Sequence, residues 1–208
     1  MLYRKNKTIL SILTIAAMTV LMSSLGVLTQ SVLAQKNATT TSFASSAATK
    51  TSNNFLTYQN PTYGIKIQYP SDWTISQTGL TDYNNIVAFY SPLGNLSDMS
   101  PQRLLLSRTH YSQNISLNDY SKLINDTLKE PGLQIVESKS IVLTGGLLAH
   151  RVVFIPPAGN VPFKPEIMLV WTAKGDNTYT LIYNGDAAKY HIFLPTIEKM
   201  INSFEITK

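Results

Sequence analysis

The segment Ile167-Met168-Leu169-Val170-Trp171 is apolar at every position. A strand with one face in solvent alternates apolar and polar residues, so a strand that is apolar throughout needs cover on both faces. Such a strand belongs in the interior of a sheet with helices packed against it. No other segment of the 208-residue chain constrains the fold as strongly.

The surrounding sequence predicts further strands joined by short turns. Residues 63–69 alternate, with Tyr63 on the apolar side, and this strand ends at Pro70. The Gly-Gly pair at 145–146 and the Lys-Gly-Asp-Asn turn at 174–177 have hairpin character, so the strands that they join are antiparallel. The other predicted strands are Ile86–Tyr90, Arg103–Ser107, Gln134–Leu143, Ala149–Ile155, Glu166–Ala173 and Thr178–Tyr183.

Two amphipathic helices complete the expected elements. Ser116 and Asp119 resemble a capping box with Asp in place of Glu, which predicts a helix start, and Pro131-Gly132 ends that helix. The second helix covers residues 190–204, where Pro195 is expected to open a new helical segment after a kink. Strands joined by hairpins, together with two helices, make the fold class α+β.

The first 34 residues have the layout of a secretory signal peptide. A basic start precedes an uncharged apolar run from Ile9 to Leu28, and small or β-branched residues lead up to Ala34. We predict cleavage between Ala34 and Gln35. The apolar run is also about long enough to span a bilayer, which takes roughly 20 residues, so an uncleaved membrane anchor is the alternative. Either way, the remainder is expected to be secreted or extracytoplasmic.

Residues 35–54 are predicted to form a flexible tether, because they contain one aromatic residue and no Leu, Ile or Val. Residues 55–208 form the folded domain. Asn-X-Ser/Thr sequons are candidate glycosylation sites in an exported protein. The mature chain has them at Asn37, Asn95, Asn114 and Asn125.

Charge and cysteine content exclude several function classes. Removing residues 1–34 takes away three of the 17 basic residues and none of the 12 acidic ones, which leaves 14 against 12 and a net charge of +2. A nearly neutral domain without clustered Lys or Arg gives no support for a nucleic-acid surface. Because the chain has no Cys, disulfides, thiolate zinc sites and cysteine nucleophiles are excluded.

The sequence offers no recognisable catalytic or metal-binding motif. It lacks Gly-x-Ser-x-Gly, His-Glu-x-x-His and Asp-x-Asp-x-Asp patterns. We assign structural roles to the three histidines, His110, His150 and His191. The acidic residues Asp98, Asp119, Asp126, Glu130 and Glu137 are spread singly along the chain. A calcium site built from distant residues stays open as an alternative, because hard cations also bind backbone carbonyls.

Three segments resemble the PsbP-like domain family. The first combines Phe-x-x-Tyr at 55–58 with Tyr-Gly-Ile-x-Ile-x-Tyr-Pro-x-x-Trp at 63–73. The second is Thr-Gly-Gly-Leu-Leu-Ala-His at 144–150, and the third is Tyr-x-x-Phe-Leu-Pro-Thr-x-x-Lys-Met-Ile-x-Ser-Phe at 190–204. They occur in order across the folded region. The resemblance implies an antiparallel sheet flanked by helices on both faces, an α/β/α sandwich.

The resemblance also implies a kind of function. Such domains in plants and cyanobacteria are extrinsic, non-enzymatic subunits on the lumenal side of photosystem II, where they help to retain calcium and chloride. Relatives occur as secreted proteins of archaea and bacteria, and the export signal and tether favour that group.

We therefore expect a non-enzymatic accessory domain, secreted or tethered to the membrane surface. It would bind a protein partner or a membrane complex through a surface patch or sheet edge, without a cofactor. The alternatives are a small-ligand or calcium-binding envelope module and, third, an unrecognised hydrolase.

Overall fold

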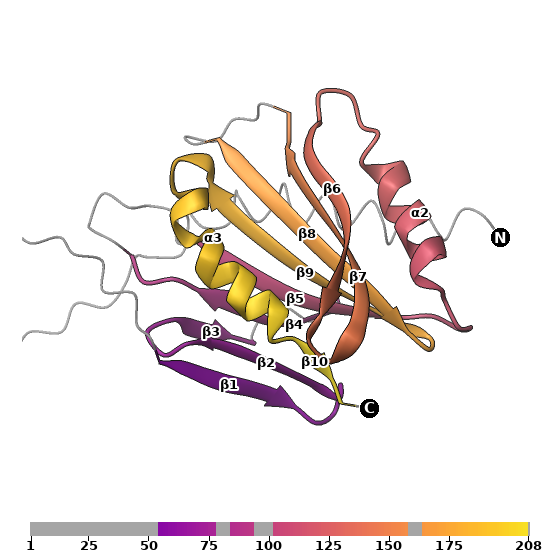
Figure 1. Cartoon of the computed structure of the whole chain (residues 1–208), viewed down its shortest axis with the longest axis horizontal. Helices are drawn as coiled ribbons and strands as arrows, with labels where there is room; N and C mark the ends of the chain where they lie inside the picture. Colours follow the sequence, from indigo (N-terminus) through magenta and orange to yellow (C-terminus); the bar gives the residue numbers. More distant parts are fainter. Residues whose placement is uncertain (1–53, 78–83, 94–101, 158–163, 208) are drawn as a thin grey trace, which may run out of the picture.

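The computed structural model describes residues 54–77, 84–93, 102–157 and 164–207. Within them, two antiparallel sheets and two α-helices make up a mixed α+β fold (Figure 1). The larger sheet has the strand order β3 (Thr74–Ser76), β4 (Asn85–Tyr90), β5 (Arg103–His110), β9 (Asn177–Asp186), β8 (Pro165–Lys174), β7 (Leu147–Ile155) and β6 (Gln134–Leu143). The smaller sheet has the order β1 (Phe55–Asn60), β2 (Ile65–Pro70) and β10 (Glu205–Ile206).

The apolar segment lies inside the larger sheet, as predicted. It forms the central half of β8, which pairs with β9 on one side and β7 on the other. Its side chains from Ile167 to Trp171 are all buried. Both predicted hairpins are confirmed. Gly145 and Gly146 each have φ of 77° between β6 and β7, and Gly175 has φ of 62° between β8 and β9.

The prediction of a single sheet is wrong, because the first strands form a separate sheet. β2 pairs with β1 and with the C-terminal β10, and none of these strands pairs with a strand of the larger sheet. The smaller sheet is attached mainly by packing, with one hydrogen bond from the Lys174 side chain of β8 to the Ile206 carbonyl of β10 at 3.4 Å. Ile65 and Ile67 are fully buried, and Phe89 of β4 has ring contacts with Tyr58 and Tyr69 at centroid distances of 5.9 and 5.2 Å.

Helix α2 (Leu117–Thr127) begins where the capping box placed it. The Ser116 side chain accepts a hydrogen bond from the Asp119 backbone N–H at 3.1 Å, which satisfies one of the free donors at the helix start. The amphipathic character predicted for this helix is confirmed, since Tyr120, Ile124 and Leu128 are buried.

Helix α3 (Ala187–Asn202) corrects the expectation for Pro195. The helix is one element with Pro195 inside it, rather than a new segment that opens there. Proline removes one backbone donor, and the loss is tolerated here because Pro195 lies on the exposed side, where water can reach the freed carbonyl of His191. Asp186 caps the helix by accepting from the Ala188 N–H at 3.1 Å.

Consecutive residues of the larger sheet alternate between two apolar cores. Val153 and Met168 belong to the α3-side core, which also contains Ile197 of α3 and residues of the smaller sheet. Their neighbours in sequence belong to the α2-side core, which contains Val152, Ile167, Leu169 and Trp171 together with Tyr120 and Ile124 of α2.

The predicted signal peptide and nearly all of the tether lie outside the described residues. Among the helices of the described part, none has the length and apolar character needed to cross a membrane.

Candidate functional site

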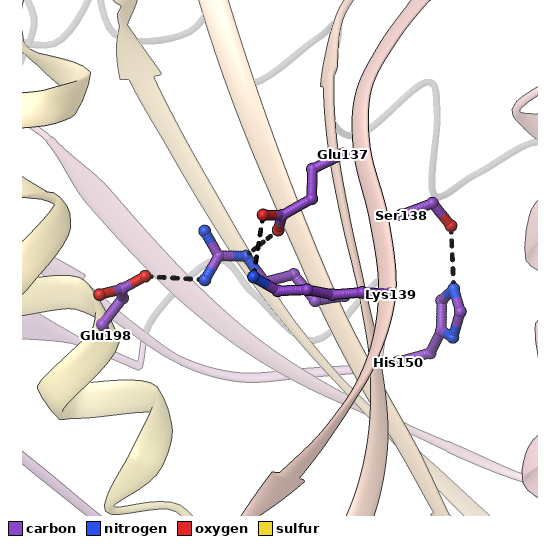
Figure 2. A network of polar contacts seen from close by, with 6 residues as sticks. Glu137, Ser138, Lys139, His150 and Glu198 are labelled. Carbon is purple, nitrogen blue, oxygen red and sulfur yellow. Dashed lines mark hydrogen bonds and ion pairs between the residues drawn. The ribbon is translucent and has the colours of Figure 1, made fainter.

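Strands β6 and β7 form one border of the larger sheet, which we call the β6–β7 edge (residues 134–155). Local sequence explains why the hairpin forms here, since two glycines with positive φ make the turn and β-branched residues fill the strands. Because successive side chains of a strand point to opposite faces, the hairpin carries a different polar cluster on each face. Figure 2 shows the two clusters pointing away from each other.

On the α3 side, Arg151 of β7 holds two carboxylates. Its Nε lies 2.8 Å from Oε1 of Glu137 on β6, and its Nη1 donates to Oε1 of Glu198 on α3 at 2.7 Å (Figure 2). Lys139 pairs with the other oxygen of Glu137 at 2.9 Å. The Arg151 side chain is only 13% exposed, so this ion cluster ties helix α3 to the β6–β7 edge at a largely desolvated point.

On the opposite face, His150 lies between two serines and a tryptophan. Its Nε2 is 3.1 Å from the Ser138 hydroxyl, its Nδ1 is 3.5 Å from the Ser140 hydroxyl, and its ring lies 4.9 Å from that of Trp171. The indole N–H of Trp171 in turn donates to Ser121 of α2 at 2.8 Å. Desolvation lowers the pKa of His150 and favours the neutral ring.

Among the described residues, the Ser138–His150 contact lacks the third group of a catalytic triad. A serine nucleophile needs a histidine that is oriented by a third group, usually a carboxylate on its other ring nitrogen. Within the described residues that nitrogen faces Ser140, and no carboxylate contacts His150. Ser138 also lies within strand β6 rather than on a strained turn.

The structure brings no two of the three histidines together. His110 ends β5 and contacts Asn177 and Asp176, whereas His150 lies on β7, with β9 and β8 between the two strands. His191 is exposed on α3, next to the ring of Tyr190.

The scattered acidic residues are likewise kept apart. Asp119 caps α2, Asp126 pairs with Lys129 at 2.8 Å, Glu130 is exposed after the helix and Glu137 belongs to the ion cluster. Asp98 lies outside the described residues. In the described part of the chain, no group of three His, Asp or Glu residues could hold a metal ion.

A third polar cluster, which the sequence did not reveal, lies at the end of β9. The hydroxyl of Tyr183 donates to Oε1 of Gln102 at 2.7 Å, and its ring stacks on that of Tyr190 at 4.9 Å. A Cβ on Gly185 would collide with that same Gln102 oxygen and with the Tyr183 hydroxyl, so any larger residue requires these side chains to move. Burial raises the pKa of both tyrosine hydroxyls. The Asn-Gly-Asp sequence at 184–186 is the only local signal of this close approach.

Several tyrosines of the strands pack in the two cores. Tyr179 and Tyr183 are buried, and Tyr69 packs against the α3-side core. Tyr63 departs from the expectation because it precedes β2 and is exposed, with the Arg108 guanidinium 5.5 Å from its ring centroid.

Two of the four sequons fall within the described residues. Asn114 is exposed just before α2, and Asn125 is exposed in the last turns of that helix. Asn37 and Asn95 lie outside the described residues, as does the predicted cleavage point between Ala34 and Gln35.

The chain resembles known proteins both in sequence and in fold. A family model described as PsbP-like protein matches residues 12–206. The solution structure of cyanobacterial PsbP (CyanoP) from Synechocystis sp. PCC 6803 is similar with a TM-score of 0.50 at 12% identity, over 78% of this chain and 98% of that one.

The crystal structure of LpqN, involved in cell envelope biogenesis of Mycobacterium tuberculosis, is similar with a TM-score of 0.54 at 15% identity, over 69% of this chain and 83% of that one. At these identities the two solved structures show a shared fold only. No curated protein matches the sequence significantly.

Proposed function

The chain belongs to the PsbP-like protein family, and on that basis we propose that it is a non-enzymatic accessory domain that binds a protein partner outside the cytoplasmic membrane. The observation that carries the proposal is the open β6–β7 edge. It presents apolar side chains beside polar clusters, and these clusters lack the geometry of a catalytic site. Leu148 is 63% exposed and Val142 is 61% exposed, on paired positions of the two strands.

The proposed location rests on the sequence before the domain. A signal-like segment and a polar tether precede the first strand, which is the layout of an exported or membrane-tethered protein. The two solved relatives are described as a cyanobacterial PsbP and as an envelope biogenesis protein. We extend that setting to this chain and infer a partner in an envelope or membrane complex.

We further infer that one helix covers each face of the larger sheet. The support is the alternation of the two cores, because residues that are neighbours in a strand point to opposite faces. Val153 packs in the core of α3 and Val152 in the core of α2. The border strands, where Leu148 and Val142 are exposed, remain open for binding.

Affinity isolation from native membranes tests the proposed function. The full chain, extracted in mild detergent, should retain a partner, and Leu148→Glu should reduce the captured amount by about tenfold because it places a charge in the apolar patch. The matched control is Leu56→Glu, which changes an apolar residue of β1 that is 47% exposed. Leu56→Glu should capture as much as the wild type. A chain that is always isolated alone would reject the proposal.

Calorimetry separates this function from the calcium-binding alternative. If the domain is an accessory protein without a metal, titrating the full chain with Ca²⁺ should release no heat and should leave the melting temperature unchanged. A saturable heat signal with a rise in melting temperature would instead favour the ion-binding module.

A further inference from the structure

Strand β6 has a neighbour on one side only among the described strands. It is ten residues long and ends the order of the larger sheet. Three of its apolar side chains are largely open to solvent, namely Ile135 at 44%, Val136 at 54% and Val142 at 61%. Since alternate backbone N–H and C=O groups of an edge strand point outward without a partner, β6 is a template for an added strand.

The usual protections of an edge strand are incomplete here. The two charged residues of β6, Glu137 and Lys139, neutralise each other at 2.9 Å. Its bulge, between Ile135 and Glu137, does not stop pairing, because β7 passes it and continues with Ile135 opposite Phe154. An added strand can pass the bulge in the same way on the outer side.

We propose that β6 of a second copy of this chain pairs in antiparallel orientation with β6 of the first. The two-fold axis passes between the two Ser138 residues, which lie opposite each other. Two-fold interfaces use the same surface on both copies, so a strand that is complementary to itself is sufficient. This register places Glu137 opposite Lys139 of the second copy, and the symmetry makes the pair twice. Past the bulge it brings the exposed Val142 opposite Leu133 of the second copy.

Charge complementarity selects this register over its neighbours. Moving the axis to Ser140 would put Glu137 opposite Leu143 and Lys139 opposite Ile141, so that neither charge meets an opposite one. Opposite charges directly across an antiparallel pair stabilise it, and β6 offers only one such combination. The larger sheets of the two copies then become one continuous sheet.

Cysteine cross-linking tests both the pairing and its register. Because the chain has no Cys, Ser138→Cys introduces a single thiol. Residues directly opposite in an antiparallel pair have Cα atoms about 4.5–5.5 Å apart, which suits a disulfide. In the proposed dimer, the full-length variant in mild detergent should form a disulfide-linked dimer under gentle oxidation. The matched control, Ser140→Cys, should cross-link at least about tenfold less. In the proposed register, residues 140 of the two chains lie about 13 Å apart along the strands, which is too far for a disulfide.

A charge exchange provides the second test. Lys139→Glu places like charges opposite each other twice and should weaken dimerisation about tenfold in sedimentation equilibrium. The double variant Glu137→Lys with Lys139→Glu restores opposite pairs and should recover it. Circular dichroism confirms that each variant is folded.

Cross-linking through Ser140→Cys in place of Ser138→Cys would overturn the register, and a wild type that stays monomeric would overturn the pairing. A monomeric chain that still captures its membrane partner would reject this inference and leave the proposed function intact.

Discussion

Arg151 illustrates at the level of one residue what the polar clusters do. It is adjacent to His150 in sequence, yet the two side chains point to opposite faces of the sheet and join different clusters. Arg151 connects the β6–β7 hairpin with α3, and its partner Glu198 on that helix lies 47 residues further along the chain. Its contribution is therefore to the relative placement of helix and sheet.

Replacing Arg151 by Met should lower the free energy of unfolding by about 1–3 kcal/mol. The variant removes the ion pair of Glu198 and leaves Glu137 with Lys139 alone, while the partial exposure of both carboxylates limits the cost. Urea unfolding followed by circular dichroism measures the change.

Lys139→Met is the matched control for Arg151→Met. The Lys139 side chain is half exposed, so loss of its ion pair should cost less than about 0.5 kcal/mol. Equal losses in the two variants would mean that the cluster does not hold α3 in place.

At the level of elements, helix α2 depends on its first turn. The hydrogen bond from the Ser116 hydroxyl, followed by the contact with Lys122, lowers the pKa of Asp119. A carboxylate whose pKa is lowered by folding stabilises the fold above its unfolded pKa of about 3.9, and this stabilisation is lost as the pH falls through the lower folded pKa.

Asp119→Asn should therefore be less stable than the wild type near pH 6, and the difference should disappear near pH 2. Urea unfolding at the two pH values measures it. Ser116→Ala removes the donor, so it should show the same pH-dependent loss together with the loss of the cap, about 1 kcal/mol at neutral pH. A difference that persists unchanged at pH 2 would refute this role of the carboxylate.

At the level of the whole molecule, the two cores share one sheet. The α2-side and α3-side cores use alternate residues of the same strands. If one core loses its packing, the strands that also carry the other core lose their support on one face. We expect the domain to unfold in one cooperative transition, as domains of this size commonly do.

Truncation of one residue in each core tests this cooperativity. Ile124→Ala in α2 and Ile197→Ala in α3 remove buried side chains and should each cost about 2–4 kcal/mol. Both should shift the same single transition, with the same midpoint by tryptophan fluorescence and by circular dichroism. A separate early transition in either variant would show that the cores are independent.

Much of the fold could be predicted from local sequence. The uniform apolar character of 167–171 identified an interior strand, the glycines identified the hairpins, and Ser116 with Asp119 identified the start of α2. These predictions succeeded because the relevant forces act within a few residues: alternation sets the face, positive φ requires glycine, and a side chain caps the adjacent backbone.

The candidate site could not be predicted in the same way. Three features depend on which distant segments meet. The strands β1, β2 and β10 form their own sheet, α3 continues through Pro195, and Gly185 makes room for Gln102. The same holds for Arg151 between its two carboxylates and for β6 as an open edge. The sequence by itself determined the elements and their apolar faces. The tertiary structure decided their partners, because pairing between distant strands is set by the packing of the whole chain rather than by any local pattern.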